Sequence, residues 1–231
     1  MKKKAWFLLQ NVKSVQIGGI YDLAWSPDGN HVAAIDDNDQ LSVYYTSNIS
    51  NAYTVSVDVG SGDQALEVDY SPDGAMIAVV IGRSGNGGTN GEVQIYHSSN
   101  GTEITSFNPS SADRFYSVDW SPDSSRIVIG GREDVWVYDT NTWSQNATRN
   151  TNRGSINSVA WSPDGHSIAV CEAWENSGAR VRMLDFPSMN ERWVYSSSTS
   201  CNTVIFSPDS TLVAASHTYY QADGASIRIF Q

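Results

Sequence analysis

Basic side chains are scarce in this chain of 231 residues: 14 Lys and Arg stand against 25 Asp and Glu, for a net charge of −11. Proteins that bind nucleic acids contact the phosphates through clustered Lys and Arg. The charge therefore argues against a nucleic-acid partner. Charged residues of either sign make up only 17% of the chain, whereas aromatic residues make up 11%. This composition argues against disorder and for one folded domain.

Long apolar runs are also lacking, so no membrane-spanning helix is predicted. Lysines at positions 2–4 precede an apolar segment of five residues, Ala5–Leu9. A secretory signal needs an apolar core of about 7–15 residues. We therefore interpret Ala5–Gln10 as a β-strand with a basic lead, and we expect a cytoplasmic protein.

Motifs of known chemistry are few. The sequence has no Gly-x-Ser-x-Gly elbow, no phosphate-binding loop and no Cys-x-x-Cys pair. The Gly-rich segment 82–91 has no Lys and opens no predicted helix, so it is typical of a flexible hairpin loop. The four histidines share no metal-ligand spacing and are expected at the surface: His31, His97, His166 and His217. We predict no metal and no cofactor.

One pentapeptide, aromatic-Ser-Pro-Asp-Gly/Ser, recurs five times along the chain. Its aromatic residues are Trp25, Tyr70, Trp120, Trp161 and Phe206, at spacings of 45, 50, 41 and 45. Pro favours the second position of a type I turn, and the Ser and Asp side chains can bond nearby backbone groups. Ser124 and Ser210 replace the final Gly in two copies, and we expect slight strain in those turns.

Strands surround each turn. An alternating strand precedes it, and a nearly continuous apolar strand follows, which indicates burial on both faces. A third strand follows in every copy, and a more polar fourth strand follows in four copies. Four strands in about 45 residues is the spacing of a β-propeller blade.

The sequence therefore predicts an all-β, five-bladed β-propeller with four-stranded antiparallel blades in a single domain, residues 1–231. The fifth copy ends after its third strand, and Ala5–Gln10 is predicted to supply the fourth, which would close the ring. The predicted blades span about 17–58, 62–107, 112–148, 154–196, and 200–231 with 5–10.

The turn motif, with strands that end in Tyr138-Asp139 or Leu184-Asp185, resembles the WD-repeat family of propellers. The resemblance covers essentially the whole chain. The Gly-His dipeptide of that family is absent from all five copies. The same turn is also similar to those of TolB-type and surface-layer propellers, so the family within the propellers stays open. The resemblance to WD-repeat proteins implies a rigid scaffold that presents loops.

The connections from second to third strands are longer in copies two, four and five, and they all belong to one face of the predicted ring. Loops on a rigid scaffold often carry binding residues, and Trp and Tyr often anchor interfaces. A ligand or partner site is therefore predicted here. Alternatively, these aromatic side chains pack back on their own blades. The candidate residues are Trp174, Tyr219, Tyr220, Arg83 and Arg180.

The first strands, which line the central channel, carry a second candidate group: Asp22, Glu67, Asp69 and Asp119. Converging carboxylates can hold a cation or act as general acid and base. The favoured interpretation is that they contact channel water or backbone N–H groups between blades.

The two cysteines are too few for a disulfide framework. Cys171 ends a second strand, and Cys201 begins the first strand of the next blade. A disulfide between them is conceivable, but two free thiols are the default expectation.

These features predict a monomeric, non-catalytic binding propeller with a protein or peptide partner. The abundant Ser, Thr and Asn with exposed aromatics would also suit a carbohydrate-binding propeller. That alternative predicts similar sites on several blades, which the unequal loops do not show. A glycoside-processing enzyme is a third interpretation and would need paired carboxylates in the channel.

Overall fold

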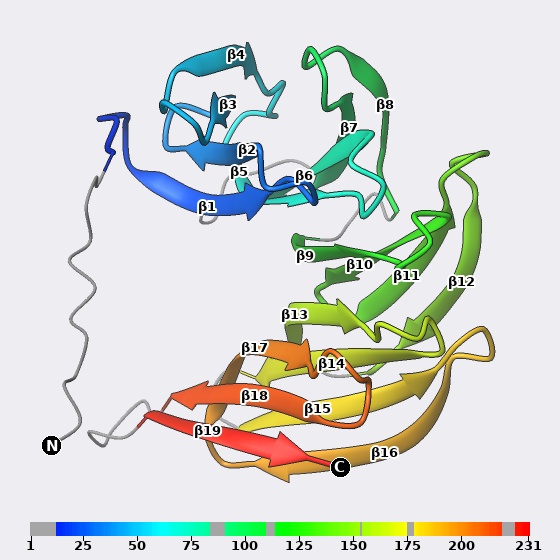
Figure 1. The fold of residues 1–231 in the computed structure, drawn as a ribbon. Coiled ribbons are helices and arrows are strands. Elements are labelled where there is room, and N and C mark those ends of the chain that lie inside the picture. The colour runs from blue at the N-terminus through cyan, green and yellow to red at the C-terminus, as the bar shows by residue number, and fades with distance from the viewer. Residues whose placement is uncertain (1–12, 84–90, 110–113, 153, 175–177, 219–224) are drawn as a thin grey trace, which may run out of the picture.

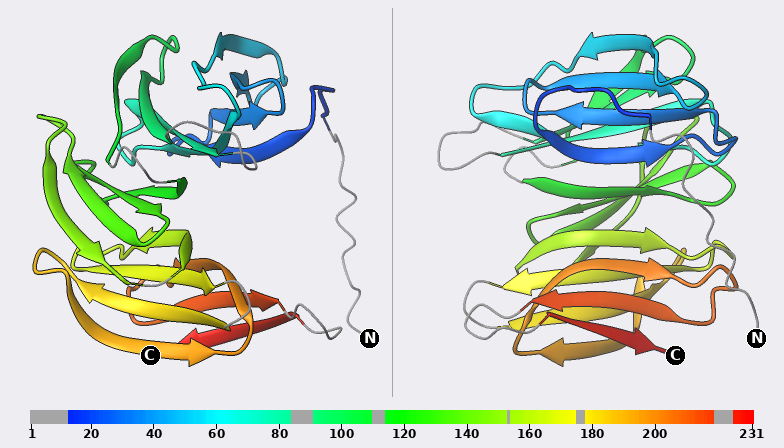
Figure 2. Two further views of the ribbon diagram at one scale, coloured as in Figure 1. Left: turned by 180° about the vertical axis from the view of Figure 1, so that it is seen from behind. Right: turned by 60° about the vertical axis from the view of Figure 1, so that its left-hand side comes forward.

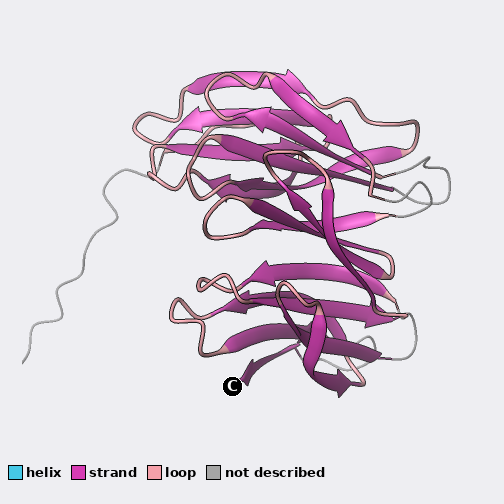
Figure 3. Ribbon diagram, turned by 90° about the vertical axis from the view of Figure 1, so that its right-hand side faces the viewer, coloured by secondary structure: helices cyan, strands magenta, loops and turns pink. Residues whose placement is uncertain are grey.

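A computed structural model describes residues 13–83, 91–109, 114–152, 154–174, 178–218 and 225–231. These residues form five antiparallel sheets placed around a central axis, and the described part of the chain contains no helix (Figures 1 and 3). It consequently has no helix long and apolar enough to cross a membrane.

We call each of these sheets a blade, and the strands of each pair in chain order. Blade 1 comprises β1 (Ile20–Trp25), β2 (His31–Asp36), β3 (Gln40–Tyr45) and β4 (Asn51–Ser56). Blade 2 comprises β5 (Asp63–Tyr70), β6 (Met76–Arg83), β7 (Glu92–His97) and β8 (Glu103–Phe107). Blade 3 comprises β9 (Phe115–Trp120), β10 (Arg126–Gly131), β11 (Asp134–Asp139) and β12 (Gln145–Asn150). Blade 4 comprises β13 (Ser155–Trp161), β14 (Ser167–Trp174), β15 (Gly178–Asp185) and β16 (Asn190–Ser197). Blade 5 comprises β17 (Ser200–Phe206), β18 (Val213–Thr218) and β19 (Ala225–Phe230).

The repeated pentapeptide forms the turn between the first and second strands of every blade. In blade 1, the Ser26 hydroxyl donates to Asp28 Oδ1 (2.7 Å) and accepts from the His31 backbone N–H (2.9 Å). The Gly29 N–H closes the turn on the Ser26 carbonyl at 2.9 Å. The same three bonds recur at Ser71, Ser121, Ser162 and Ser207. The predicted role of Ser and Asp in these turns is confirmed.

Ser124 and Ser210 occupy the left-handed region, with φ of 59° and 61°, where Gly29 has φ of 71°. Each hydroxyl accepts a backbone N–H from the preceding blade: Ser124 Oγ from Asp73 and Ser210 Oγ from Asp164, both at 3.0 Å. The strain expected at these serines is therefore offset by a contact that glycine cannot make.

The core lies between neighbouring blades. The second strands of blades 2, 3 and 4 are buried on both faces, as their continuous apolar sequence predicts: residues 77–81, 127–129 and 168–171 are at most 1% exposed. In blade 5, Ala214 and Ser216 of the second strand are partly exposed. Four apolar clusters fill the four interfaces between consecutive blades. Each cluster combines side chains of two blades, so the blades support one another.

The ring is open among the described residues. Blade 5 has three strands, and a gap separates it from β1 (Figures 1 and 2). The segment predicted to complete blade 5, Ala5–Gln10, lies outside the described residues. Closure of the ring by that segment stays a prediction.

Cys171 and Cys201 form a disulfide that joins β14 of blade 4 to β17 of blade 5. The expectation of two free thiols is therefore wrong. The packing of blade 4 against blade 5 brings the two Cα atoms to 5.7 Å, within the range of a disulfide. Sequence spacing alone could not reveal this distance between two blades.

Candidate functional site

Two of the four predicted channel carboxylates, Asp22 and Glu67, belong to a repeated contact between blades. In blades 1 to 4, the residue three positions before the motif aromatic accepts a backbone N–H of the next blade. These contacts are Asp22 Oδ2 with Val68 N (2.9 Å), Glu67 Oε2 with Val118 N (3.0 Å), Ser117 Oγ with Val159 N (3.1 Å) and Ser158 Oγ with Val204 N (3.2 Å). Asp119 Oδ2 accepts the Trp161 N–H at 2.6 Å. The favoured interpretation of these residues, as acceptors for backbone N–H groups between blades, is confirmed for Asp22, Glu67 and Asp119.

Burial and mutual repulsion shift the titration of these carboxyl groups. Burial raises the pKa of Asp119 to about 6. The pKa of Glu67 is raised well above its usual value, first by burial and then by the charges of Asp22 and Asp69. Burial, followed by the charge of Asp119, does the same for the pKa of Asp69. Within the described ranges, no group of three or more His, Cys, Asp or Glu could hold a metal ion.

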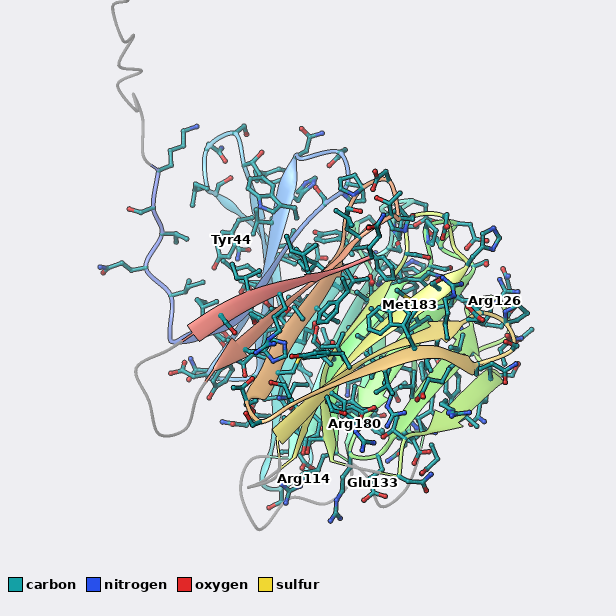
Figure 4. All side chains as sticks on the ribbon, turned by 90° about the horizontal axis from the view of Figure 1, so that it is seen from below. Tyr44, Arg114, Arg126, Glu133, Arg180 and Met183 are labelled. Atoms are coloured by element: carbon teal, nitrogen blue, oxygen red, sulfur yellow. A yellow bond between two sulfur atoms is a disulfide. The ribbon has the colours of Figure 1, made fainter. Side chains whose placement is uncertain are left out.

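The predicted loop site is only partly visible. Tyr219 and Tyr220 lie outside the described residues, as do the side chains of Trp174 and Arg83 at the ends of β14 and β6. Arg180 lies on β15, where it is partly buried and stands opposite Glu172 of β14 in the strand register. In Figure 4 it lies on the same side as Arg114 and Glu133. The structure therefore places one member of this set and does not test its grouping.

Apolar side chains that the sequence analysis did not single out are exposed at the two ends of the open ring. Leu23 is 59% and Trp25 66% exposed, although their counterparts in blade 3, Val118 and Trp120, are each 3% exposed. At the other end, blade 5 exposes Ile205 (59%), Ile227 (77%) and Ile229 (67%). We call these two groups the seam faces. They are found by comparing the exposure of residues that occupy equivalent positions in different repeats.

A cavity of about 510 Å³ lies between blades 1 and 2, on the side of the motif turns. Its walls include Asp28, His31, Tyr45, Tyr53, Tyr70 and Asp73. The sequence analysis missed it because these residues come from two blades, on four strands and two motif turns.

Three comparisons relate this architecture to known proteins. The model of the family "Eukaryotic translation initiation factor eIF2A" matches residues 4–132 and 124–218. No curated protein matches the chain. Among solved structures, Kuenenia stuttgartiensis hydrazine synthase is similar over 92% of this chain and 59% of that chain, with a TM-score of 0.73 and 18% identity.

The structural likeness concerns the fold alone, because the identity is low and this chain spans about three-fifths of the hydrazine synthase chain. The two family matches together extend over residues 4–218, far more than half of the chain. They agree with the five sheets around a common axis and with the repeated turn. The chain belongs to the eukaryotic translation initiation factor eIF2A family.

Proposed function

We propose that this chain is a non-catalytic binding propeller that holds a protein or peptide partner in translation. Membership of the eIF2A family supports the connection with translation initiation. The net charge of −11 favours a protein component over RNA as the direct partner. The propeller supplies a rigid scaffold in which the blades are joined by apolar clusters and by side-chain-to-backbone bonds.

The seam faces carry this proposal. Leu23 and Trp25 occupy positions that are buried in every other blade where the motif aromatic is Trp or Tyr. Exposed apolar groups of this kind commonly mark protein interaction surfaces, and a Trp side chain is a frequent anchor. Ile227 and Ile229, both more than two-thirds exposed, offer a second apolar wall on blade 5. A partner segment with apolar side chains would bury both walls.

The loop residues form a second part of the proposal. Arg83 and Trp174 end second strands, Arg180 lies on a third strand, and Tyr219 and Tyr220 come between the second and third strands of blade 5 in the sequence. We retain them as a contact surface for the same partner.

The last blade is the third part. We infer that Ala5–Gln10 pairs with the free edge of β19 and supplies the fourth strand of blade 5. This strand would cover an edge whose backbone groups are otherwise open to pairing with other chains. Removing residues 1–10 should then lower the thermal midpoint and promote association, whereas an unchanged midpoint and a monomer would contradict the inference.

Site-specific crosslinking tests the partner surface. A photo-crosslinking residue at position 25 or 205 should capture a defined translation component in a translation extract. The same residue at position 194, an isolated exposed valine on β16 that is 42% exposed, should not. Trp25→Asp should abolish the association, and Val194→Asp should retain it. Equal capture from all three positions would contradict the proposal.

A further inference from the structure

The cavity between blades 1 and 2 has aromatic walls and acidic turns. Tyr53 reaches it from β4, and its hydroxyl donates to the Ser98 carbonyl at 2.9 Å. His31 and Tyr45 stand side by side on β2 and β3, with ring centroids 5.0 Å apart. The carboxylates come from two motif turns, Asp28 of blade 1 and Asp73 of blade 2. None of the described residues that line this cavity is Lys or Arg.

Asp28 keeps its negative charge over the whole neutral range. The Ser26 hydroxyl, and after it the backbone and side-chain N–H groups of Asn30, lower the pKa of Asp28 to about 2. Burial raises the pKa of Tyr70 to about 12, and the negative charge of Asp28 adds to the effect. The negative charge of Asp28 therefore influences the hydroxyl of Tyr70, which lines the same cavity. A positive group placed here would meet a fixed negative charge.

Tyr70 is the most buried aromatic side chain of the cavity, with 6% of its surface exposed. Its hydroxyl oxygen has no hydrogen-bond partner within the described chain. A buried hydroxyl without a partner is unfavourable by about 1–3 kcal/mol. The wall of this cavity thus retains hydrogen-bonding capacity that the chain itself does not use.

At the interface between blades 3 and 4, the position equivalent to this cavity is occupied by a cationic side chain of the protein itself, that of Arg126. Arg126 is the sixth residue after Trp120, as His31 is the sixth after Trp25. The Arg126 guanidinium carbon lies 5.3 Å from the ring centroid of Phe186 (Arg126 is labelled in Figure 4). The Phe186 ring also contacts Trp161, the counterpart of Tyr70, at 5.0 Å between centroids.

Backbone bonds confirm that the two places correspond. The Phe186 N–H donates to the His166 carbonyl, and the Ser98 N–H donates to the Ala75 carbonyl, at 2.9 and 3.0 Å. Phe186 and Ser98 therefore occupy equivalent positions of blades 4 and 2. Arg126 and Phe186 occupy the interface between blades 3 and 4. At the equivalent interface between blades 1 and 2, the smaller His31 and Ser98 line the 510 Å³ cavity.

The positive charge of Arg126 acts on two acidic residues of this interface, Asp123 and Asp139. The pKa of Asp123 is lowered, chiefly by the Ser121 hydroxyl and also by the charge of Arg126. Asp123 is the counterpart of Asp28 in the motif. The repeat thus shows, within this one chain, which chemical group its interface accepts: a guanidinium on an aromatic ring beside a motif aspartate.

We propose that the cavity between blades 1 and 2 binds a cationic side chain, an arginine of a protein partner, between its tyrosine rings and the carboxylates of Asp28 and Asp73. This inference rests on the proposed function as a protein-binding propeller and names one anchor of the partner. Stacking on tyrosine and charge pairing with a carboxylate both favour guanidinium over neutral groups.

A peptide titration tests the chemistry directly. The probe is acetyl-Gly-Arg-Gly-amide, compared with the same peptide carrying citrulline, which is neutral and nearly isosteric. The arginine peptide should shift the backbone amide signals of Gly29, Gly74 and Ser98 in a saturable way. The citrulline peptide should bind at least about tenfold more weakly. Equal binding of the two peptides, no saturable shift, or a response only to a neutral disaccharide would overturn the proposal.

A matched pair of variants distinguishes loss of charge in the cavity from loss of charge in a motif turn elsewhere. Asp28→Asn removes charge from the cavity, and Asp164→Asn makes the same change in the equivalent turn of blade 4, away from the cavity. Asp28→Asn should weaken the arginine peptide about tenfold, and Asp164→Asn should leave its binding unchanged. Equal effects of the two variants would contradict the site.

Filling the cavity is a second, independent test. The double variant His31→Arg with Ser98→Phe copies the arrangement of Arg126 and Phe186 into blades 1 and 2. It should abolish binding of the arginine peptide while the circular dichroism spectrum stays that of the native protein. Persisting peptide binding by the folded variant would overturn the proposal. If it does not fold, the Asp28→Asn comparison decides.

The two proposals fail in different ways. A partner captured at the seam faces that the cavity-filled variant still binds with unchanged affinity would leave the proposed function standing and overturn the arginine anchor. Specific binding of the arginine peptide without any captured protein would support the cavity and contradict the proposed function.

Discussion

The hydroxyl of Ser124 accepts the backbone N–H of Asp73 at 3.0 Å, which links the motif turns of blades 3 and 2. The same contact joins Ser210 to Asp164 between blades 5 and 4. In both cases serine stands where the other copies have glycine, and its φ is positive. Two substitutions that look unfavourable in a turn thus connect neighbouring blades.

Substitution of Ser124 separates the hydrogen bond from the backbone strain. Ser124→Ala should lower the free energy of unfolding by about 1 kcal/mol, because it removes the acceptor and keeps the unfavourable φ. Ser124→Gly should be nearly neutral, because relief of strain of about 1 kcal/mol offsets the lost bond. Urea unfolding measures both. An alanine variant as stable as the wild type would mean that the contact contributes nothing.

Tryptophan substitutions test whether the ring is open at the seam faces. Trp120 is 3% exposed, and Trp120→Ala should lower the free energy of unfolding by about 3–5 kcal/mol. Trp25 is 66% exposed, and Trp25→Ala should change the free energy of unfolding by less than about 1 kcal/mol. Chemical unfolding of the two variants makes the comparison. Similar large losses for both would show that β1 is buried in solution and the ring closed.

The disulfide between Cys171 and Cys201 should contribute to stability because it closes a loop with a sequence separation of 30. Replacing both cysteines by alanine should lower the free energy of unfolding by about 3 kcal/mol. Reductant should lower the thermal midpoint of the wild type and leave that of the double variant unchanged. Mass spectrometry of the untreated protein after proteolysis should identify the linked peptides, and their absence would contradict the bond.

The buried channel carboxyl groups predict a loss of stability with rising pH. The pKa of Asp119 is raised to about 6 by burial, so the folded state binds this proton more tightly than the unfolded state, whose pKa is near 4. The contribution is therefore complete below about pH 4 and is lost as pH rises through about 6. Glu67 and Asp69, whose pKa values are also raised well above their usual values by burial, add in the same direction. Unfolding free energies should decrease between about pH 5 and 7.

Asp119→Asn should weaken this pH dependence and stabilise the protein at pH 7 by about 1–2 kcal/mol. The control is Asp209→Asn in a motif turn. The Ser207 hydroxyl, followed by the Thr211 groups, lowers the pKa of Asp209, so its contribution is lost only as pH falls below about 4. The control should not alter the slope between about pH 5 and 7. An unchanged slope in Asp119→Asn would refute the assignment.

Much of the fold follows from the repeat. The Ser-Pro-Asp turn, the alternating first strand and the buried second strand are local features, and each of the five sheets contains one copy of the turn between its first two strands. The candidate sites were harder to find. Of the five predicted loop residues, only the side chain of Arg180 is described, and the cavity near Tyr70 joins residues that no single repeat contains.

The sequence by itself determined the blades, because strand alternation and turn chemistry act between residues that are close in the chain. Only the tertiary structure decided how blades meet. It paired Cys171 with Cys201 and placed Asp22 and Glu67 against the backbone of the next blade. It also exposed Trp25 at an open end while burying its counterparts Tyr70, Trp120 and Trp161. These outcomes depend on distances between side chains 30 to 51 positions apart. Such distances are set by the packing of one sheet on another and are not written in either repeat alone.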